Sequence, residues 1–206
     1  ASVNGLAIGV TAAGDVAKDR IAYRSGAKPN DLICLSGDLG AAYMGLHLLE
    51  REKRACGGQP DPKPKFEGHE YILGRQLKPE ARTDIIERLA EAGIVPTSMI
   101  DITDGLASET LHLCKSSGCG ARIYLDRLPI ARQTHDMAEE LHADPVVAAL
   151  NGGQDYELLF TVPLSKQQEI FALGVDVIGH VTAAGTGAML VTPDGSEIAL
   201  KAPGWK

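Results

Sequence analysis

Hydrophobic and polar positions follow one another in blocks along the chain, and the blocks predict strands and helices in turn. Short apolar runs predict strands at 6–12, 32–36, 121–125 and 177–181, another that ends in Asp101 and Asp104, and another in the segment beyond Gly152 and Gly153. Apolar residues at helical spacing predict helices at 41–54, 80–92, 106–117, 133–141 and 165–173. A turn at 193–196 predicts a hairpin close to the end of the chain. The pattern therefore predicts a mixed β-sheet with helices packed against it, in the α/β class or its α+β variant.

Loop segments separate these elements. Cys56 to Gly68 is rich in Gly, Pro and Lys and predicts an exposed linker, and Gly93 is a plausible C-cap of the helix before it. The strand at 6–12 begins almost at the first residue, and the chain does not start with Met. We therefore expect further sequence before Ala1.

Composition narrows the class of protein. The chain has 206 residues, of which 44% are hydrophobic, so we expect one domain with a substantial core. The formal net charge is −7 and no basic cluster contains aromatic residues, which argues against nucleic acid as a partner. The apolar runs are too short to span a bilayer, and the start lacks the features of a signal peptide. We expect no membrane partner, a cytoplasmic location and reduced, scattered cysteines.

The segment Met99–Leu106 carries the most chemical information. An apolar strand ends in Asp101 and Asp104, with Thr103 between them and Gly105 just before a helix. Carboxylate oxygens are preferred ligands of Mg²⁺, and a hydroxyl with the first N–H groups of a helix suits phosphate oxygens. The same residue types are also favoured helix caps, so the segment by itself fits either a metal-phosphate site or ordinary capping.

A second landmark is the stretch 151–162, Asn-Gly-Gly-Gln-Asp-Tyr-Glu-Leu-Leu-Phe-Thr-Val. Its two glycines permit a tight turn or a close backbone approach to a ligand, and the residues after them predict a buried strand. A plain loop before a strand is the alternative. No P-loop, nucleophile elbow or H-E-x-x-H helix occurs, so the residues alone indicate an α/β domain with a candidate Mg²⁺-phosphate site.

Taken in order, these landmarks resemble the thiamine-monophosphate kinase family of the aminoimidazole-ribonucleotide-synthetase-like superfamily. The stretch from Gly152 to Phe160 is the part most particular to this kinase. The matching segments are 14–18, Arg24-Ser25-Gly26-Ala27-Lys28, Ser36-Gly37-Asp38-Leu39-Gly40, Met99–Leu106, Asn151–Val162 and Gly204-Trp205.

The resemblance implies an enzyme that phosphorylates thiamine monophosphate to thiamine diphosphate with ATP and Mg²⁺. It implies that residues 1–206 form the PurM-like C-terminal domain, which binds ATP and substrate, and that the N-terminal domain of the family is absent from this chain. The family's N-terminal domain carries further acidic Mg²⁺ ligands and the sheet that forms a homodimer. A chain without that domain is expected to have almost no activity alone, because phosphoryl transfer depends on positioning and charge neutralisation.

Residue by residue, the resemblance implies Mg²⁺ ligands at Asp101 and Asp104, ATP contacts at Arg24 and Thr103, with Arg20 a weaker candidate for the arginine, and substrate contacts at Gln154 and Trp205. The family usually has Glu where this chain has Gln154, so one negative charge is lost while shape and hydrogen bonding remain. The indole of Trp205 suits a thiazolium by cation–π attraction, although a near-terminal Trp also serves as a simple anchor. No general base is assigned, because the accepting phosphate is already ionised.

Two alternatives remain at this stage. Another enzyme of the superfamily, such as aminoimidazole ribonucleotide synthetase or a selenophosphate synthetase, shares the sheet and the ATP site. However, the stretch from Gly152 to Phe160 favours the kinase, and so does Trp205. A nucleotide-binding module without catalysis is the alternative from a different class.

Overall fold

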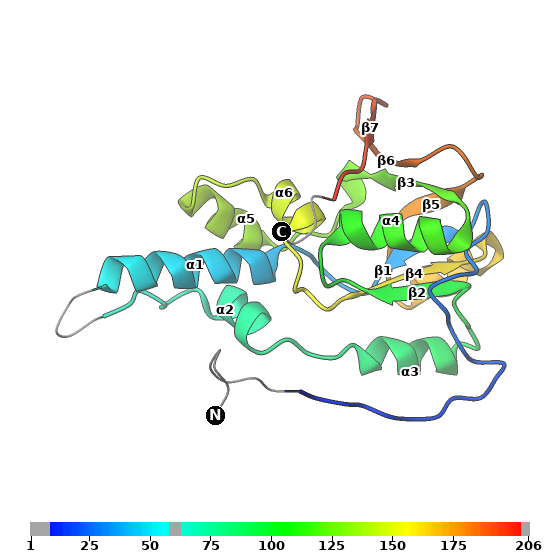
Figure 1. Cartoon of the computed structure of the whole chain (residues 1–206), viewed down its shortest axis with the longest axis horizontal. Coiled ribbons are helices and arrows are strands. Elements are labelled where there is room, and N and C mark those ends of the chain that lie inside the picture. Colours follow the sequence, from blue (N-terminus) through cyan, green and yellow to red (C-terminus); the bar gives the residue numbers. More distant parts are fainter. Residues whose placement is uncertain (1–8, 58–62, 203–206) are drawn as a thin grey trace.

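A single seven-stranded sheet organises the described residues, 9–57 and 63–202, of the computed structural model (Figure 1). Its strands run in the order β2-β4-β1-β5-β3-β6-β7. Neighbours are antiparallel except β3 and β6, which are parallel, so the predicted mixed sheet is confirmed. The strands are β1 Leu32–Leu35, β2 Ser98–Asp101, β3 Gly120–Tyr124, β4 Leu158–Val162, β5 Asp176–Thr182, β6 Ala188–Val191 and β7 Glu197–Ala199.

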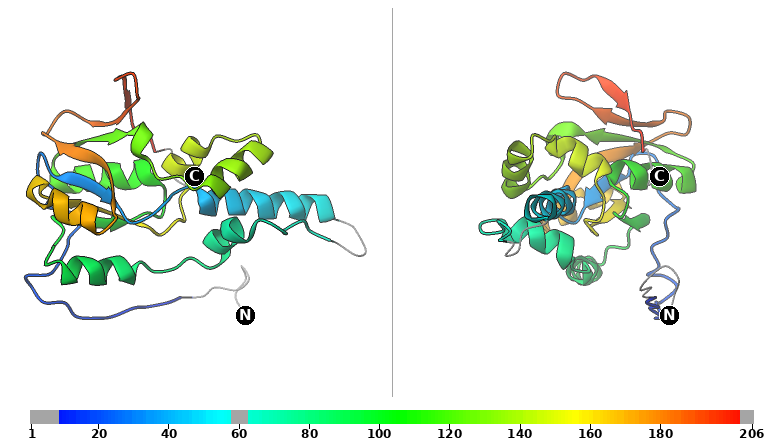
Figure 2. Two further views of the ribbon diagram at one scale, coloured as in Figure 1. Left: turned by 180° about the vertical axis from the view of Figure 1, so that it is seen from behind. Right: turned by 60° about the vertical axis from the view of Figure 1, so that its left-hand side comes forward.

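Helices lie on both faces of this sheet and beyond one end of it (Figures 1 and 2). They are α1 Ala41–Cys56, α2 Glu70–Leu77, α3 Thr83–Glu91, α4 Leu106–Ser117, α5 Arg132–Glu140, α6 Pro145–Asn151 and α7 Gln167–Ala172, with short 3-10 turns at Leu125–Arg127 and Leu164–Lys166. Within the described segments, none of these helices has the length and apolar character needed to cross a membrane.

The two faces of the sheet bury separate cores, as the alternation of side chains along a strand requires. In β1, Ile33 and Leu35 pack in the core that includes residues of α4 and α6. The neighbouring Leu32 and Cys34 pack in the opposite core, with residues of α3 and α7. β1 therefore lies in the middle of a helix–sheet–helix sandwich and is buried along its whole length.

A third cluster joins α1, α2, α5 and α6 beside the sheet. Met44 and Leu48 of α1 meet Ile72 of α2 and Met137 of α5 there, and all four side chains are almost fully buried. Gly45 permits the close approach of α2, because a Cβ at this position would lie 2.5 Å from the carbonyl oxygen of Ile72. This helical cluster extends away from the sheet to the left in Figure 1.

Most predicted elements are found within one to three residues of their expected bounds, including the final hairpin and the C-terminal turn at Gly93, whose φ is +64°. The four cysteines are free thiols, as expected. The strand predicted at 6–12 is wrong over 9–12, because these residues belong to no strand and Val10 is 89% exposed. An apolar run forms a strand only where a neighbouring strand accepts its hydrogen bonds. Residues 6–8 and Trp205 lie outside the described residues.

Candidate metal and phosphate site

The two predicted metal ligands lie where β2 ends at the edge of the sheet. Asp101 is the last residue of β2, and Asp104 lies in the turn that leads into α4. Both side chains are exposed, and in the described part of the chain neither carboxylate has a hydrogen-bond or ion-pair partner. Mg²⁺ commonly takes one or two carboxylates and completes its shell with water and substrate phosphates. The unengaged oxygens of Asp101 and Asp104 fit that requirement.

The buried carboxylate of Glu109 accepts hydrogen bonds from this turn. Glu109 in the first turns of α4 is 2% exposed, and its Oε1 accepts the amide of Asp104 at 3.2 Å and the hydroxyl of Thr103 at 3.4 Å. Burial raises the pKa of Glu109, and its Oε2 has no hydrogen-bond partner within the described residues. Glu109 therefore fixes the backbone of the turn while the carboxylates of Asp101 and Asp104 stay outside.

The capping alternative for this segment is not what the structure shows. α4 begins at Leu106, and its N-cap is Gly105, with φ +110°. Neither aspartate nor Thr103 occupies the cap position, and the hydroxyl of Thr103 donates to Glu109. The acidic residues of the turn are therefore available for a ligand.

The second sequence landmark packs directly against the first. The amide of Gln154 donates to the carbonyl of Thr103 at 2.8 Å, and the amide of Tyr156 donates to the carbonyl of Ile102 at 2.9 Å. Gly153 makes this contact possible, because a Cβ there would lie 2.3 Å from the carbonyl oxygen of Thr103. The close approach predicted for the glycine pair is thus made to the chain's own backbone, and the two motifs form one surface.

The backbone between Gly153 and Glu157 has an unusual conformation. Gln154 and Tyr156 both have positive φ, at 63° and 54°, which costs about 1–2 kcal/mol for each residue with a Cβ. Burial alternates along the segment: Asp155 and Glu157 are buried, whereas Gln154 and Tyr156 are partly exposed. The inward-facing acids therefore anchor a segment whose outward-facing residues border the turn at Thr103.

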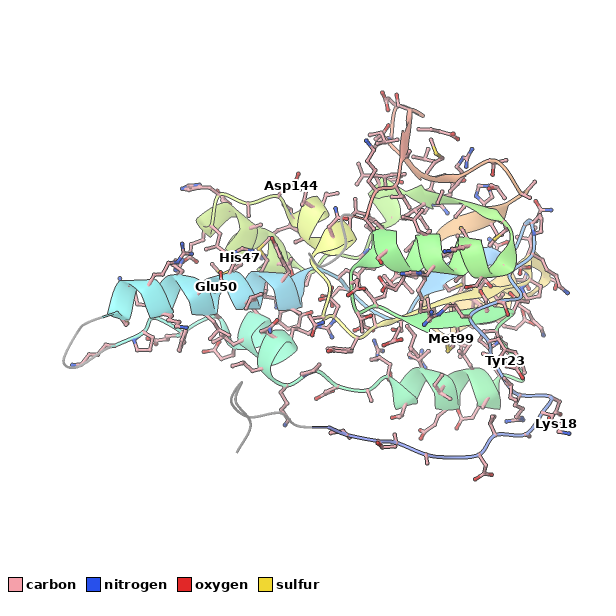
Figure 3. All side chains as sticks on the ribbon, viewed as in Figure 1. Lys18, Tyr23, His47, Glu50, Met99 and Asp144 are labelled. Atoms are coloured by element: carbon pink, nitrogen blue, oxygen red, sulfur yellow. The ribbon has the colours of Figure 1, made fainter. Side chains whose placement is uncertain are left out.

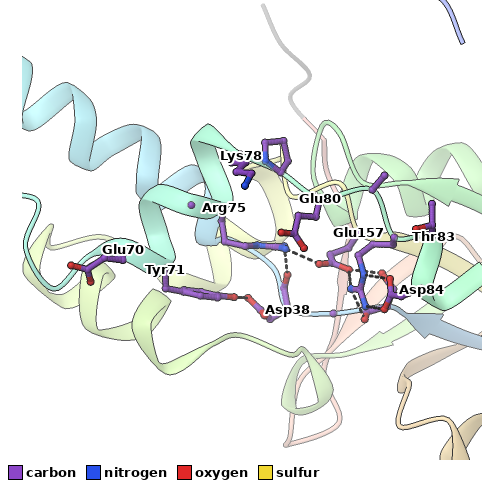
Figure 4. A pocket seen from close by; sticks show the side chains of 15 residues that line it. Asp38, Glu70, Tyr71, Arg75, Lys78, Glu80, Thr83, Asp84 and Glu157 are labelled. Carbon is purple, nitrogen blue, oxygen red and sulfur yellow. Dashed lines mark hydrogen bonds and ion pairs between the residues drawn. The ribbon is translucent and has the colours of Figure 1, made fainter.

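Two arginines neutralise the inward-facing Glu157, which is 1% exposed. Arg75 of α2 donates to Glu157 at 2.9 Å, and Arg82, just before α3, forms a second ion pair with the same carboxylate. These residues line a cavity of about 760 Å³ that also contains Asp38 and Tyr71 (Figure 4). The hydroxyl of Tyr71 donates to Asp38 at 2.6 Å.

The sequence pattern did not predict this arginine pair. The signal that was available is the alternation in Asp155-Tyr156-Glu157, which precedes an apolar strand and therefore predicts inward-facing acids. Buried acids need cationic partners or hydrogen-bond donors. However, nothing local indicates which arginines fill that role, because Arg75 and Arg82 lie 82 and 75 residues from Glu157 along the chain.

Asp155 connects the site to α1. Its carboxylate accepts the amides of Gly40 and Ala42 at 2.9 and 3.2 Å, at the start of α1, and lies 4.0 Å from Arg75. Burial raises the pKa of Asp155 to about 6, although these amides and Arg75 favour the ionised form. The Ser36–Gly40 turn is thereby tied to the segment that carries Gln154.

Arg24 lies at the outer side of the same edge strand. The residue before it, Tyr23, accepts a backbone hydrogen bond from Met99 of β2 at 2.8 Å, and the two are neighbours in Figure 3. Arg24 itself is exposed. The structure thus brings the segment of Arg24 to β2, and it brings Gln154 to Thr103, whereas Trp205 lies outside the described residues.

Asp101 and Asp104 are fewer protein ligands than a complete metal centre contains. The described residues contain no group of three or more His, Cys, Asp or Glu side chains that could hold a metal ion among themselves. Two carboxylates such as those of Asp101 and Asp104 would by themselves complete only part of a coordination shell.

Comparison with known proteins defines the class to which this fold and site belong. The family model "AIR synthase related protein, C-terminal domain" matches residues 28–192, and the chain belongs to that family. Within it, the similar curated proteins are thiamine-monophosphate kinases. The enzyme from Escherichia coli strain K12 is 36% identical over 202 residues, which are 94% of this chain and 56% of that protein. The enzyme from Aquifex aeolicus is 32% identical over 189 residues, which are 91% and 55%.

A solved structure supports the same relationship. AaThiL complexed with AMPPCP and TMP superimposes with a TM-score of 0.71 at 32% identity, covering 91% of this chain and 54% of that one. The resemblance noted in the sequence is confirmed, as is the fold class. The chain spans about half the length of the curated relatives it matches.

Proposed function

We propose that this chain forms the C-terminal half of an enzyme that phosphorylates thiamine monophosphate to thiamine diphosphate with ATP and Mg²⁺. The observation that carries the proposal is the pair of unengaged carboxylates, Asp101 and Asp104, in a turn packed against the segment of Gln154. The similarity to thiamine-monophosphate kinases, and to a structure that holds AMPPCP and TMP, supports it.

Each site residue has a role in this proposal. Asp101 and Asp104 hold Mg²⁺, which neutralises the charge of the nucleotide phosphates when bound. Thr103 and Arg24 contact the nucleotide, and Gln154 and Trp205 contact the thiamine moiety. The phosphate of the substrate is ionised at neutral pH, so the transfer needs no strong general base from this chain.

The remaining parts of the proposal concern the whole protein. We propose that residues 1–206 are the ATP- and substrate-binding domain of a longer enzyme, that the longer enzyme is a cytoplasmic homodimer, and that further acidic ligands come from its other domain. The incomplete set of metal ligands in the described residues supports this arrangement.

Calorimetry with AMPPCP and the Asp104→Asn variant tests the proposal. We expect nucleotide binding to require Mg²⁺ and to weaken about tenfold or more in Asp104→Asn, because a charged metal ligand is lost. The matched control is Asp136→Asn, which removes an exposed aspartate of α5 and leaves binding unchanged.

Product analysis separates the alternatives. We expect the intact enzyme to form thiamine diphosphate from ATP and thiamine monophosphate. We expect the Asp104→Asn variant to lose this activity. Nucleotide binding that is indifferent to both Mg²⁺ and Asp104→Asn contradicts the kinase and favours a binding module. Turnover of an aminoimidazole precursor in place of thiamine monophosphate favours another enzyme of the superfamily.

A further inference from the structure

The side chain of Gln154 is fixed between two loops by two different hydrogen bonds. Its Nε2 donates to the carbonyl of Thr103 at 3.4 Å, and its Oε1 accepts the hydroxyl of Tyr156 at 2.8 Å. The carbonyl of Thr103 only accepts, so the NH₂ group must face it and the amide oxygen must face Tyr156. The partners themselves therefore determine the orientation of this carboxamide.

This arrangement leaves a defined pair of groups unused. A carboxamide has two N–H donors and two acceptor lone pairs, and the structure engages one of each. One N–H and one lone pair remain on a side chain that is only partly buried. An aminopyrimidine offers the complementary pair, a ring nitrogen that accepts beside an exocyclic amine that donates.

The hydroxyl of Tyr156 reaches Gln154 because the backbone between them is held in place. Both residues have positive φ, and the intervening Asp155 is tied to the start of α1. Glu157, on the other side of Tyr156, is held by Arg75 and Arg82. The tyrosine thus extends from a braced segment, and its only side-chain hydrogen bond in the described structure is to Gln154.

We propose that Tyr156 is a positioning residue that orients the carboxamide of Gln154 to pair with the aminopyrimidine ring of the phosphoryl acceptor. This inference rests on the proposed function, because that function supplies the acceptor. Tyr156 acts through Gln154 and sets the preference for an acceptor that contains the ring.

The first test measures the side chain of Gln154 without any ligand. In the full chain labelled with ¹⁵N, we expect the side-chain NH₂ of Gln154 to be as ordered as the neighbouring backbone by heteronuclear NOE. Tyr156→Phe removes only one hydroxyl and is expected to make this NH₂ mobile. Tyr124→Phe, which removes a hydroxyl bonded to His180 on β5, is the matched control and leaves Gln154 ordered. Unchanged order in Tyr156→Phe overturns the proposal.

The second test measures binding of two probes. Tyr156→Phe is expected to weaken thiamine monophosphate about fivefold, the value of one typical hydrogen bond. The affinity for Mg²⁺-AMPPCP should be unchanged. The affinity for the phosphorylated thiazole that lacks the pyrimidine should be unchanged as well. Equal weakening of all three ligands indicates a merely structural tyrosine and overturns the proposal.

The two tests also separate this inference from the function on which it rests. If the intact enzyme shows no response to thiamine monophosphate while Gln154 still depends on Tyr156 for its order, the proposed acceptor is wrong and the orienting contact stands. If thiamine monophosphate binds but Gln154 does not depend on Tyr156, the function stands and this inference is wrong. Gln154→Leu is a second variant: it keeps a side chain of similar size but removes both hydrogen-bonding groups, and it is expected to weaken the binding of thiamine monophosphate as well.

Discussion

Gly153 is the residue that allows the two halves of the site to touch. Its φ of +70° and its contact with the carbonyl of Thr103 each exclude an ordinary side chain. A methyl group there would push the segment of Gln154 away from the turn that carries Asp104. The alignment of the proposed metal ligands with the proposed substrate contact therefore depends on a residue that has no functional group.

We predict that Gly153→Ala lowers the free energy of unfolding more than Gly174→Ala does. Gly174 has nearly the same φ, +63°, but nothing lies within 4 Å of the added Cβ. Both variants bear the cost of a left-handed backbone, about 1–2 kcal/mol, whereas Gly153→Ala adds about 1–3 kcal/mol for the clash. Urea denaturation of the two variants measures the difference, and equal losses would contradict the close packing described here.

At the scale of residues, the sequence predicted where the acidic turn lies, between the end of a strand and the start of a helix. Asp101, Thr103 and Asp104 are neighbours along the chain, so a strand-to-helix pattern is enough to place them together. Gln154 was expected from the family resemblance, whereas its bond to Tyr156 depends on an unusual backbone that no simple pattern reveals. Arg75 and Arg82 were missed because the carboxylate they neutralise lies far away in sequence.

Among the elements, α3 shows how directly the hydrophobic pattern determines packing. Ile85 and Leu89 are 2% and 3% exposed and meet β-strand residues in the core on that face of the sheet, whereas Ile86 is 45% exposed. Adjacent isoleucines on one helix thus occupy opposite environments, as a period of 3.6 residues requires.

Ile85→Ala and Ile86→Ala make a matched pair. We expect Ile85→Ala to reduce the free energy of unfolding by about 2–5 kcal/mol through lost burial and a cavity. Ile86→Ala should cost less than about 1 kcal/mol, because its side chain already contacts water. Thermal or chemical unfolding gives both values, and similar losses would show that α3 is turned differently on the sheet.

Elements with a clear period were predictable, and those without one were not. α2 was missed because it has one fully packed apolar position, Ile72. α6 is short, and its signals are the cap Asp144, which accepts two amides, and the proline that follows. The strand expected at 6–12 is incorrect over 9–12, because apolar character alone does not supply a pairing neighbour.

At the scale of the whole molecule, the ion pairs of Glu157 hold together several segments that are distant in sequence. They connect α2, the segment before α3 and the Ser36–Gly40 turn. The backbone carbonyl of Glu157 also accepts the amide of Ile102, the residue after β2, at 2.8 Å. Arg75 also donates to the backbone carbonyls of Asp38 and Asp155. One buried network thus links the helical cluster to the sheet edge that carries the site.

We predict that Arg75→Met destabilises the fold by about 3–5 kcal/mol, because it leaves buried acids with too little compensation. Arg132→Met is the control: its side chain is 90% exposed in a surface pair with Asp136, so the expected loss is about 1 kcal/mol or less. Chemical denaturation of both variants measures their free energies of unfolding and tests this prediction. A small loss in both would mean that Arg82 alone suffices to neutralise Glu157.

The order of the sheet has a consequence for how the protein is made. β1 is among the first elements in sequence, yet both of its neighbours, β4 and β5, come from the last third of the chain. On the ribosome, a nascent chain therefore carries an apolar segment that stays unpaired until residues 158–182, more than 120 positions later, have emerged. Such long-range pairing slows folding and prolongs the period in which chaperones can bind.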